Sequence, residues 1–169
     1  MDSLATLVVF SDFQCPGCAA FSHSAPALTE RFPRLRIVYK HFPLGQECNP
    51  SVKRDLHPQS CAAARAAVAA HLQGRFWSFQ DALFHADLSE SPGALSRIPG
   101  EDGLDIERYE MDRASDFVAA QVRRDVDLGI RLGVDATPTV YLNGRRVADP
   151  GFEALTTLIG HLLEELEED

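Results

Sequence analysis

The fold is decided by the segment Cys15-Pro16-Gly17-Cys18, which lies between an apolar, β-rich stretch over 6–11 and a stretch with helical periodicity. Apolar residues recur after Cys18 at spacings of three and four, as on one face of a helix, at Phe21, Ala25, Leu28 and Phe32. A thiol at a helix N-terminus is favoured as the thiolate, because unpaired N–H groups and the helix dipole stabilise the anion. The thiolate is the reactive form. We therefore predict that Cys15 is the attacking thiol and Cys18 the resolving thiol.

The remaining segments predict a single α/β domain over 1–169. Strands are expected over 6–11, 36–41, 139–142 and 145–148, with a tight turn at 143–144, and helices are expected over 15–32, 59–72, 76–85, 115–132 and from 152 onward. Residues 43–58 and 89–103 are rich in turn-forming residues and are predicted to be loops. The order is β-α-β, then a helical block inserted at about 59–132, then β-β-α.

Composition and charge exclude several classes of protein. The chain has 169 residues, of which 45% are hydrophobic and 24% charged, and its formal net charge is −9. That sign argues against nucleic acid or an anionic membrane surface as the main partner. No apolar run approaches the length that spans a bilayer. We expect no cofactor and no metal site.

The other two cysteines, Cys48 and Cys61, are separated by twelve residues. A second pair is most easily explained in an oxidising compartment. We therefore expect an extracytoplasmic location, in the periplasm or cell envelope, with a signal or membrane anchor outside these residues. The pair admits three interpretations. It could form a structural disulfide worth about 3 kcal/mol, act as a second redox pair that relays electrons to Cys15 and Cys18, or join them in a zinc site.

Two motifs and the block between them resemble the DsbA-like branch of the thioredoxin superfamily. They are the segment 11–18 and the predicted hairpin 137–144. The resemblance implies a thioredoxin fold and thiol–disulfide oxidoreductase activity on protein substrates. It also implies a cis bond between Thr137 and Pro138, packed beside the cysteines, with neighbouring backbone that pairs with a substrate strand. Pro16, Gly17, Thr137 and Pro138 would then form the active-site loop and the substrate-binding surface.

Shorter motifs at 42–44, 48–50, 57–61 and 73–77 are similar to a subset found alone or fused to vitamin K epoxide reductase-like membrane domains. That subset carries a second cysteine pair at positions like Cys48 and Cys61. The similarity implies an alternative function, that of a soluble redox partner for a membrane enzyme of quinone-reductase type. Whichever function applies, we expect the chain to be a monomer. A third alternative is a non-catalytic binding module stabilised by zinc or a disulfide.

The chain also departs from the family pattern. Many relatives hold a buried acid at the position of Val9, which we expect to be a plain core residue, and we expect Asp12 to lie on an exposed turn. Pro16 and Gly17 lack the histidine of strongly oxidising members, which predicts a less oxidising couple. Their order reverses that of reducing thioredoxins, so oxidase, isomerase and reductase all stay open.

The histidines suggest no further chemistry. His23, His41 and His57 have no carboxylate at metal or triad spacing in the sequence, and we interpret them as surface or packing residues. His41 ends a predicted strand that could bring it near the active site. The aromatic residues of 76–79, Trp77 among them, are predicted to lie in the core.

Overall fold

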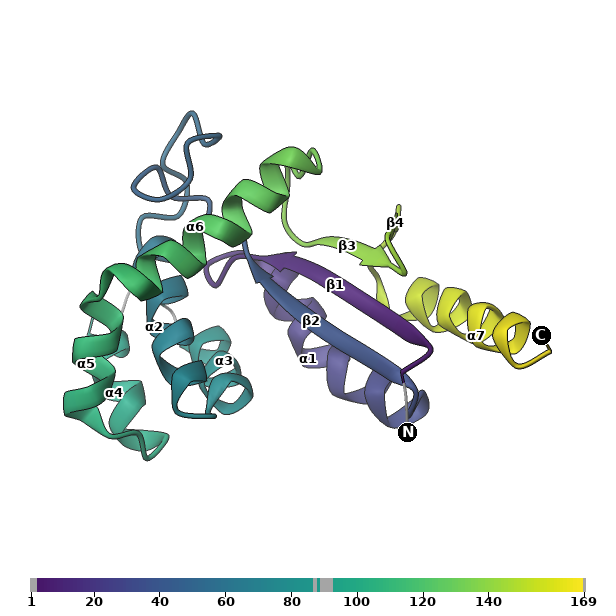
Figure 1. Cartoon of the computed structure of the whole chain (residues 1–169), viewed down its shortest axis with the longest axis horizontal. Helices are drawn as coiled ribbons and strands as arrows, with labels where there is room; N and C mark the ends of the chain where they lie inside the picture. Colours follow the sequence, from purple (N-terminus) through teal and green to yellow (C-terminus); the bar gives the residue numbers. More distant parts are fainter. Residues whose placement is uncertain (1–2, 87, 89–92, 169) are drawn as a thin grey trace.

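A computed structural model describes residues 3–86, 88 and 93–168. Its sheet has the strand order β2-β1-β3-β4, with β1 parallel to β2 and antiparallel to β3, and β4 antiparallel to β3 (Figure 1). The strands are β1 (Ala5–Ser11), β2 (Leu35–His41), β3 (Thr139–Leu142) and β4 (Arg145–Arg146). The central strand β1 therefore pairs with segments from both ends of the chain.

Helices cover both faces of the sheet, since side chains alternate along β1 between two apolar clusters. Leu7 and Val9 pack with residues of α1 (Pro16–Arg31) and α7 (Phe152–Glu168) on one face. Phe10 packs on the other face with residues of α6 (Asp116–Arg131). Val9 is fully buried in this core, as predicted.

Between β2 and β3 the chain forms a helical block with its own core. Its helices are α2 (Ser60–Leu72), α3 (Phe76–His85), α4 (Ala94–Glu101) and α5 (Ile106–Ala114), followed by α6. The alanine-rich α2 is buried on most of its surface and packs beside Phe79, Leu83 and Tyr109. Among the described residues, none of the helices combines the length and hydrophobicity needed to cross a membrane.

The predicted order β-α-β, helical block, β-β-α is confirmed. The α1 helix continues through Pro26, and the turn at 143–144 uses positive φ angles at Asn143 and Gly144. The predicted range of the last strand is wrong, because β4 comprises only Arg145–Arg146 and not 145–148.

Two further predictions are wrong. The expected loop over 89–103 contains α4, whose Leu95 and Ile98 lie one turn apart and are buried. Pro99 lies inside α4 and has no N–H to donate, but the carbonyl of Leu95 accepts instead a hydrogen bond of 3.0 Å from the Tyr109 hydroxyl. Trp77 is 55% exposed and not in the core, since α3 presents its buried face through Phe79 and Leu83. Residues 89–92 of the predicted loop lie outside the described residues.

Candidate active site

Cys15 and Cys18 lie at the start of α1, directly after β1. Cys15 is the N-cap residue, and its backbone is extended, with φ −85° and ψ 119°. Pro16 occupies the first turn, where a missing N–H costs nothing because the N–H groups there have no helical partner. Both cysteines are free thiols; Cys15 is half-buried and Cys18 is 1% exposed. The local sequence thus directs one thiol outward and the other into the protein.

The segment before β3 meets this turn from the other end of the chain. Phe10 pairs with Thr139, so the residues that follow β1 and those that precede β3 lie at the same edge of the sheet. The Sγ of Cys15 lies 3.2 Å from the carbonyl oxygen of Thr137, although the residues are 122 positions apart in sequence. The bond between Thr137 and Pro138 is cis.

Gly17 permits this close approach. A Cβ atom at Gly17 would lie 3.1 Å from Cδ of Pro138, closer than ordinary van der Waals contact. Pro138 therefore packs directly on the turn between the cysteines. The structure thus brings together the four residues predicted for this surface, Pro16, Gly17, Thr137 and Pro138.

The two thiols differ in acidity for a physical reason. A hydrogen bond from the Cys18 thiol is the main cause that lowers the pKa of Cys15 from 9.0 to about 5, while partial burial opposes the shift. Burial is the main cause that raises the pKa of Cys18 far above its ordinary value, and its hydrogen bond to Cys15 adds to the rise. The backbone N–H of Asp12 donates to the Cys18 sulfur at 3.4 Å. The arrangement favours a thiolate at Cys15 and a protonated thiol at Cys18.

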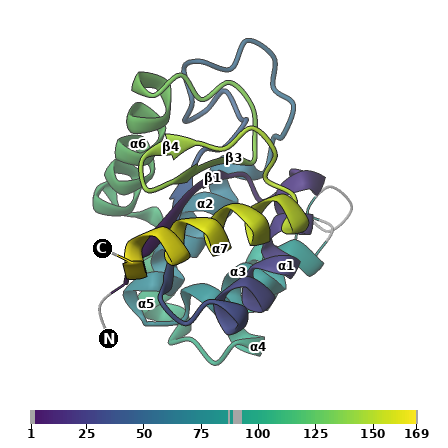
Figure 2. The same cartoon turned by 90° about the vertical axis from the view of Figure 1, so that its right-hand side faces the viewer.

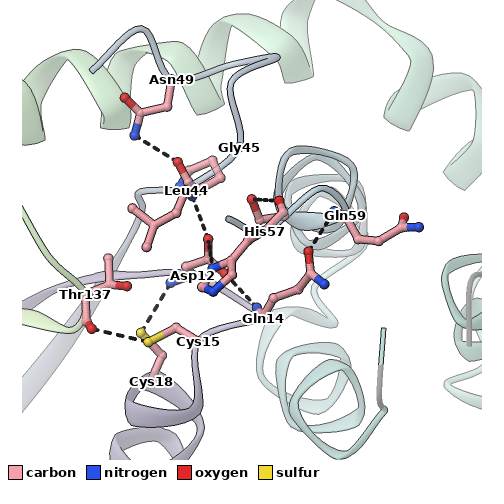
Figure 3. A network of polar contacts seen from close by, with 12 residues as sticks. Asp12, Gln14, Cys15, Cys18, Leu44, Gly45, Asn49, His57, Gln59 and Thr137 are labelled. Atoms are coloured by element: carbon pink, nitrogen blue, oxygen red, sulfur yellow. Dashed lines mark hydrogen bonds and ion pairs between the residues drawn. The ribbon is translucent and has the colours of Figure 1, made fainter. Parts of the chain in front are cut away.

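Asp12 is buried, and the expectation of an exposed turn is wrong. The residue is 1% exposed, and its carboxylate accepts hydrogen bonds of 2.6 Å from the backbone N–H groups of Gln14 and Leu44. Nδ1 of His57 lies 3.0 Å from the same carboxylate (Figure 3). The loop after β2 folds over Asp12 and removes it from water.

A second contact joins the same two segments. The Gln14 side-chain oxygen accepts a hydrogen bond of 2.7 Å from the backbone N–H of Gln59, just before α2. We call the contacts of Asp12 and Gln14 with Leu44, His57 and Gln59 the Asp12 clasp. The Asp12 clasp attaches the loop over 43–58 to the residues that precede Cys15.

Cys48 and Cys61 form a disulfide, with their Cα atoms 5.9 Å apart. The bond closes the loop that supplies His57 and Gln59 to the Asp12 clasp. Within this loop, the Asn49 side chain donates to the carbonyl of Pro43 at 2.8 Å, and both atoms are buried. With Cys48 and Cys61 bonded to each other, a zinc site made of all four cysteines is inconsistent with the structure.

The histidines occupy three different environments. His57 pairs with Asp12 and is not a plain surface or packing residue. Burial lowers the pKa of His41 to about 4, and its ring packs against Phe13, two residues before Cys15. His23 lies on α1 near His85 of α3, with 4.9 Å between their ring centroids. Asp12 and His57 are 45 positions apart, so no local spacing in the sequence reveals their contact.

A small pocket borders Cys15. It has a volume of about 130 Å³ and is lined by Phe13, Gln14, Cys15, Pro16, Ala19, Phe84, Ala86 and Leu88. The size suits one aliphatic side chain, and Cys15 is part of the lining.

Comparison with known proteins agrees with this geometry. The family model described as a DSBA-like thioredoxin domain matches residues 6–162. The crystal structure of a thioredoxin-like oxidoreductase from Silicibacter pomeroyi DSS-3 is similar, with a TM-score of 0.79 and 27% identity, over 99% of this chain and 89% of that one. The oxidised form of BdbD from Bacillus subtilis also has a TM-score of 0.79, over 96% of this chain and 89% of that one; at 22% identity it supports the fold alone.

Curated relatives include larger proteins. The Na(+)/H(+) antiporter NhaA 3 of Salinispora tropica is 33% identical over 155 residues, which are 91% of this chain and 22% of the relative. The Na(+)/H(+) antiporter NhaA of Herminiimonas arsenicoxydans is 35% identical over 147 residues, 86% of this chain and 22% of the relative. The chain thus spans about a fifth of the length of these relatives. Their names are those of ion antiporters, not of vitamin K epoxide reductase-like proteins, so that narrower resemblance stays a prediction.

The buried carboxylate generates a prediction about stability. Asp12→Ala leaves two partly buried backbone N–H groups without a partner, and we expect it to lower the free energy of unfolding of the reduced protein by about 2–4 kcal/mol. Asp55→Ala is the matched control, since Asp55 also accepts a backbone N–H, from Gln46 at 3.1 Å, but is exposed. Urea denaturation measures both. If both variants lost the same small amount of unfolding free energy, Asp12 would not hold the two loops together.

The acidity of Cys15 generates a second prediction. Thiolate absorbance of the reduced protein should titrate with a midpoint near pH 5, and Cys15→Ser should remove this transition. Because the folded pKa lies below the ordinary value of 9.0, the stability that Cys15 contributes is full above pH 9. It declines as the pH falls and is lost below about pH 5. A midpoint near pH 9 would show that the Cys18 hydrogen bond does not activate Cys15.

Proposed function

The chain belongs to the DSBA-like thioredoxin family of thiol–disulfide oxidoreductases, and we propose that it exchanges disulfides with protein substrates through Cys15 and Cys18. The observation that carries the proposal is the contrast between the two thiols within one helical turn. Cys15 has a pKa of about 5 and is half-buried, whereas the pKa of Cys18 is raised by burial. An accessible thiolate beside a protected thiol is the arrangement that a two-step exchange requires.

In the oxidising direction, the reaction begins with a disulfide between Cys15 and Cys18. A substrate thiolate attacks the Cys15 sulfur, the bond between Cys15 and Cys18 breaks, and Cys18 leaves with the electron pair and takes up a proton. A second substrate thiolate then attacks the substrate sulfur of the mixed disulfide. Cys15 leaves as the thiolate, so the substrate loses two electrons and the pair of cysteines gains them.

In the reducing direction, the same steps run backwards. The Cys15 thiolate attacks a substrate disulfide, and Cys18, after losing its proton, attacks Cys15 and releases the reduced substrate. Burial makes this deprotonation unfavourable. It therefore favours the oxidising direction, in which Cys18 ends protonated.

The pKa of Cys15 also places the couple on the redox scale. A low thiolate pKa stabilises the reduced form and makes the disulfide more oxidising. The value of about 5 lies between about 7 for thioredoxin and about 3.5 for DsbA. We therefore propose a reduction potential between about −270 mV and about −120 mV.

Substrate selection follows from the surface around Cys15. The pocket of about 130 Å³ would accept an aliphatic side chain next to the substrate cysteine. Thr137 and Pro138 border the same thiol from the opposite side, where the backbone of an extended substrate would lie. Both features suit an unfolded or flexible protein segment, because a folded substrate keeps its aliphatic side chains buried.

We propose a structural role for Cys48 and Cys61. Their disulfide closes the loop that supplies His57 and Gln59 to the Asp12 clasp, so it supports the active site without taking part in exchange. A persistent disulfide of this kind belongs to an oxidising compartment. It supports an extracytoplasmic location.

A second candidate function is that of a redox domain acting beside a membrane protein. The observation that favours it is the match to antiporters, of which the chain covers only about a fifth. If the chain has this function, Cys15 and Cys18 exchange disulfides with the thiols of a membrane-bound partner. Crosslinking of a Cys18→Ser variant in intact membranes, followed by identification of the trapped partner, tests it.

The exchange activity generates a prediction that separates the two cysteines. With a reduced peptide as substrate, the oxidised protein should gain two thiols per turnover, and both Cys15→Ser and Cys18→Ser should abolish turnover. Only Cys18→Ser should accumulate a mixed disulfide with a substrate disulfide, because it keeps the attacking thiol and lacks the resolving one. Mass spectrometry measures the trapped species.

A glutathione redox titration supplies the potential for the same pair. Trapping by Cys15→Ser but not by Cys18→Ser would reverse the assignment. A pair that never cycles with glutathione would overturn the proposed function.

The second disulfide generates a further prediction. Replacing both residues, Cys48→Ser with Cys61→Ser, should lower the free energy of unfolding by about 3 kcal/mol, the loop-closure value for a ring of this size. The reduction potential of Cys15 and Cys18 and the single-turnover exchange rate should stay unchanged. If the double variant completed one round of exchange at the normal rate but did not complete further rounds, Cys48 and Cys61 would instead relay electrons.

A further inference from the structure

Three side chains suited to metal binding meet on the surface where α1 and α3 lie side by side (Figure 2). They are His23 of α1 and Asp81 and His85 of α3, all exposed. One ligand atom from each residue lies within 4.8 Å of the others. Two imidazoles and a carboxylate from two helices thus converge at a point that the cysteine chemistry does not use.

The two helices are held in the register that this convergence needs. The side chain of Gln80 donates a hydrogen bond of 2.6 Å to the Ser22 hydroxyl, and both residues are buried. Each of them directly precedes a residue of the cluster, Asp81 and His23. On α3, Asp81 and His85 are four positions apart and therefore share one face.

The donor set indicates which ion fits. Imidazole nitrogen suits Zn²⁺, Cu²⁺ and Ni²⁺, whereas Mg²⁺ and Ca²⁺ prefer oxygen ligands alone. Bonds of about 2.0–2.1 Å to a tetrahedral Zn²⁺ put the ligand atoms about 3.4 Å apart. Small rotations of exposed side chains close the present spacing of up to 4.8 Å to this value.

The ring of His85 is held beside Asp81. Its Nδ1 lies 2.8 Å from the backbone carbonyl oxygen of Asp81 and 3.5 Å from the Asp81 carboxylate. When Nδ1 carries the proton and donates to this carbonyl, Nε2 keeps the lone pair that a metal requires. Metal-bound histidines commonly make such a bond with the second ring nitrogen, because it fixes the ring and the tautomer.

We propose that His23, Asp81 and His85 form a surface site for a divalent transition metal, with Zn²⁺ as the probe ion. Water fills the remaining coordination position. Asp81, which belongs to the cluster, also lines a pocket of about 450 Å³ together with Gln80 and Ser22. The bound ion joins α1, which begins at the redox cysteines, to α3 of the helical block, and stabilises the folded protein by mass action.

Isothermal titration calorimetry with Zn²⁺ tests the proposal on the untagged protein in its fully oxidised form. Oxidation of Cys15 and Cys18 is essential, since a free dithiol binds Zn²⁺ by itself. We expect one ion per chain and a melting temperature that rises with the Zn²⁺ concentration. His23→Ala and His85→Ala should each weaken binding at least about tenfold.

His161→Ala is the matched control, because His161 is an exposed histidine on α7 that is not part of the cluster. It should bind Zn²⁺ as tightly as the unaltered chain, and so should the Cys15→Ser, Cys18→Ser double variant. The three replaced histidines are exposed, so circular dichroism should show unchanged folding. The site would be overturned if the unaltered chain did not bind Zn²⁺, or if it bound Mg²⁺ as tightly as Zn²⁺. It would also be overturned if His23→Ala and His85→Ala bound Zn²⁺ as tightly as the unaltered chain does.

Discussion

The active site depends on a carboxylate that is completely removed from water. Asp12 lies at the end of the central strand, and its oxygens accept hydrogen bonds from Gln14 on one side and Leu44 on the other. A buried carboxylate persists only when hydrogen bonds replace its lost hydration. Because its partners belong to two separate loops, satisfying this one group holds both loops together. The carbonyl of Asp12 also accepts the N–H of Cys15, so the turn that bears the first cysteine begins from the same residue.

Cys15 and Cys18 have identical side chains, but their positions in this turn shift their pKa values in opposite directions. Cys15 occupies the N-cap position of α1 and is half-buried, and a hydrogen bond from the neighbouring Cys18 thiol stabilises its thiolate. Cys18 is one turn further and points into the core, where the anion would lose its hydration. The same hydrogen bond lowers one pKa and raises the other. The contrast between the two thiols therefore arises from one shared hydrogen bond and from the deeper burial of Cys18.

Much of the fold follows from the spacing of apolar residues in the sequence. The three long helices over the sheet, the alternation along β1 and the turn at 143–144 were all predictable from local patterns. The helix α4 was not, because Gly93 and Pro99 are ordinary signals of a loop. Its helical form depends on the distant Tyr109, whose hydroxyl satisfies the carbonyl that Pro99 leaves without a partner. Trp77 likewise lies in an amphipathic helix, but only packing decides which face of that helix is covered.

By itself, the sequence determined that a cysteine pair follows a strand and opens a helix, since strand, turn and helix are encoded within about twenty residues. It also indicated through a second motif that Pro138 is relevant, though only the sheet register brings that residue onto Gly17. Only the tertiary structure decided that Asp12 is buried against His57 and that two histidines and an aspartate meet between α1 and α3. Burial and convergence depend on contacts between segments far apart in the chain, which local spacing does not record.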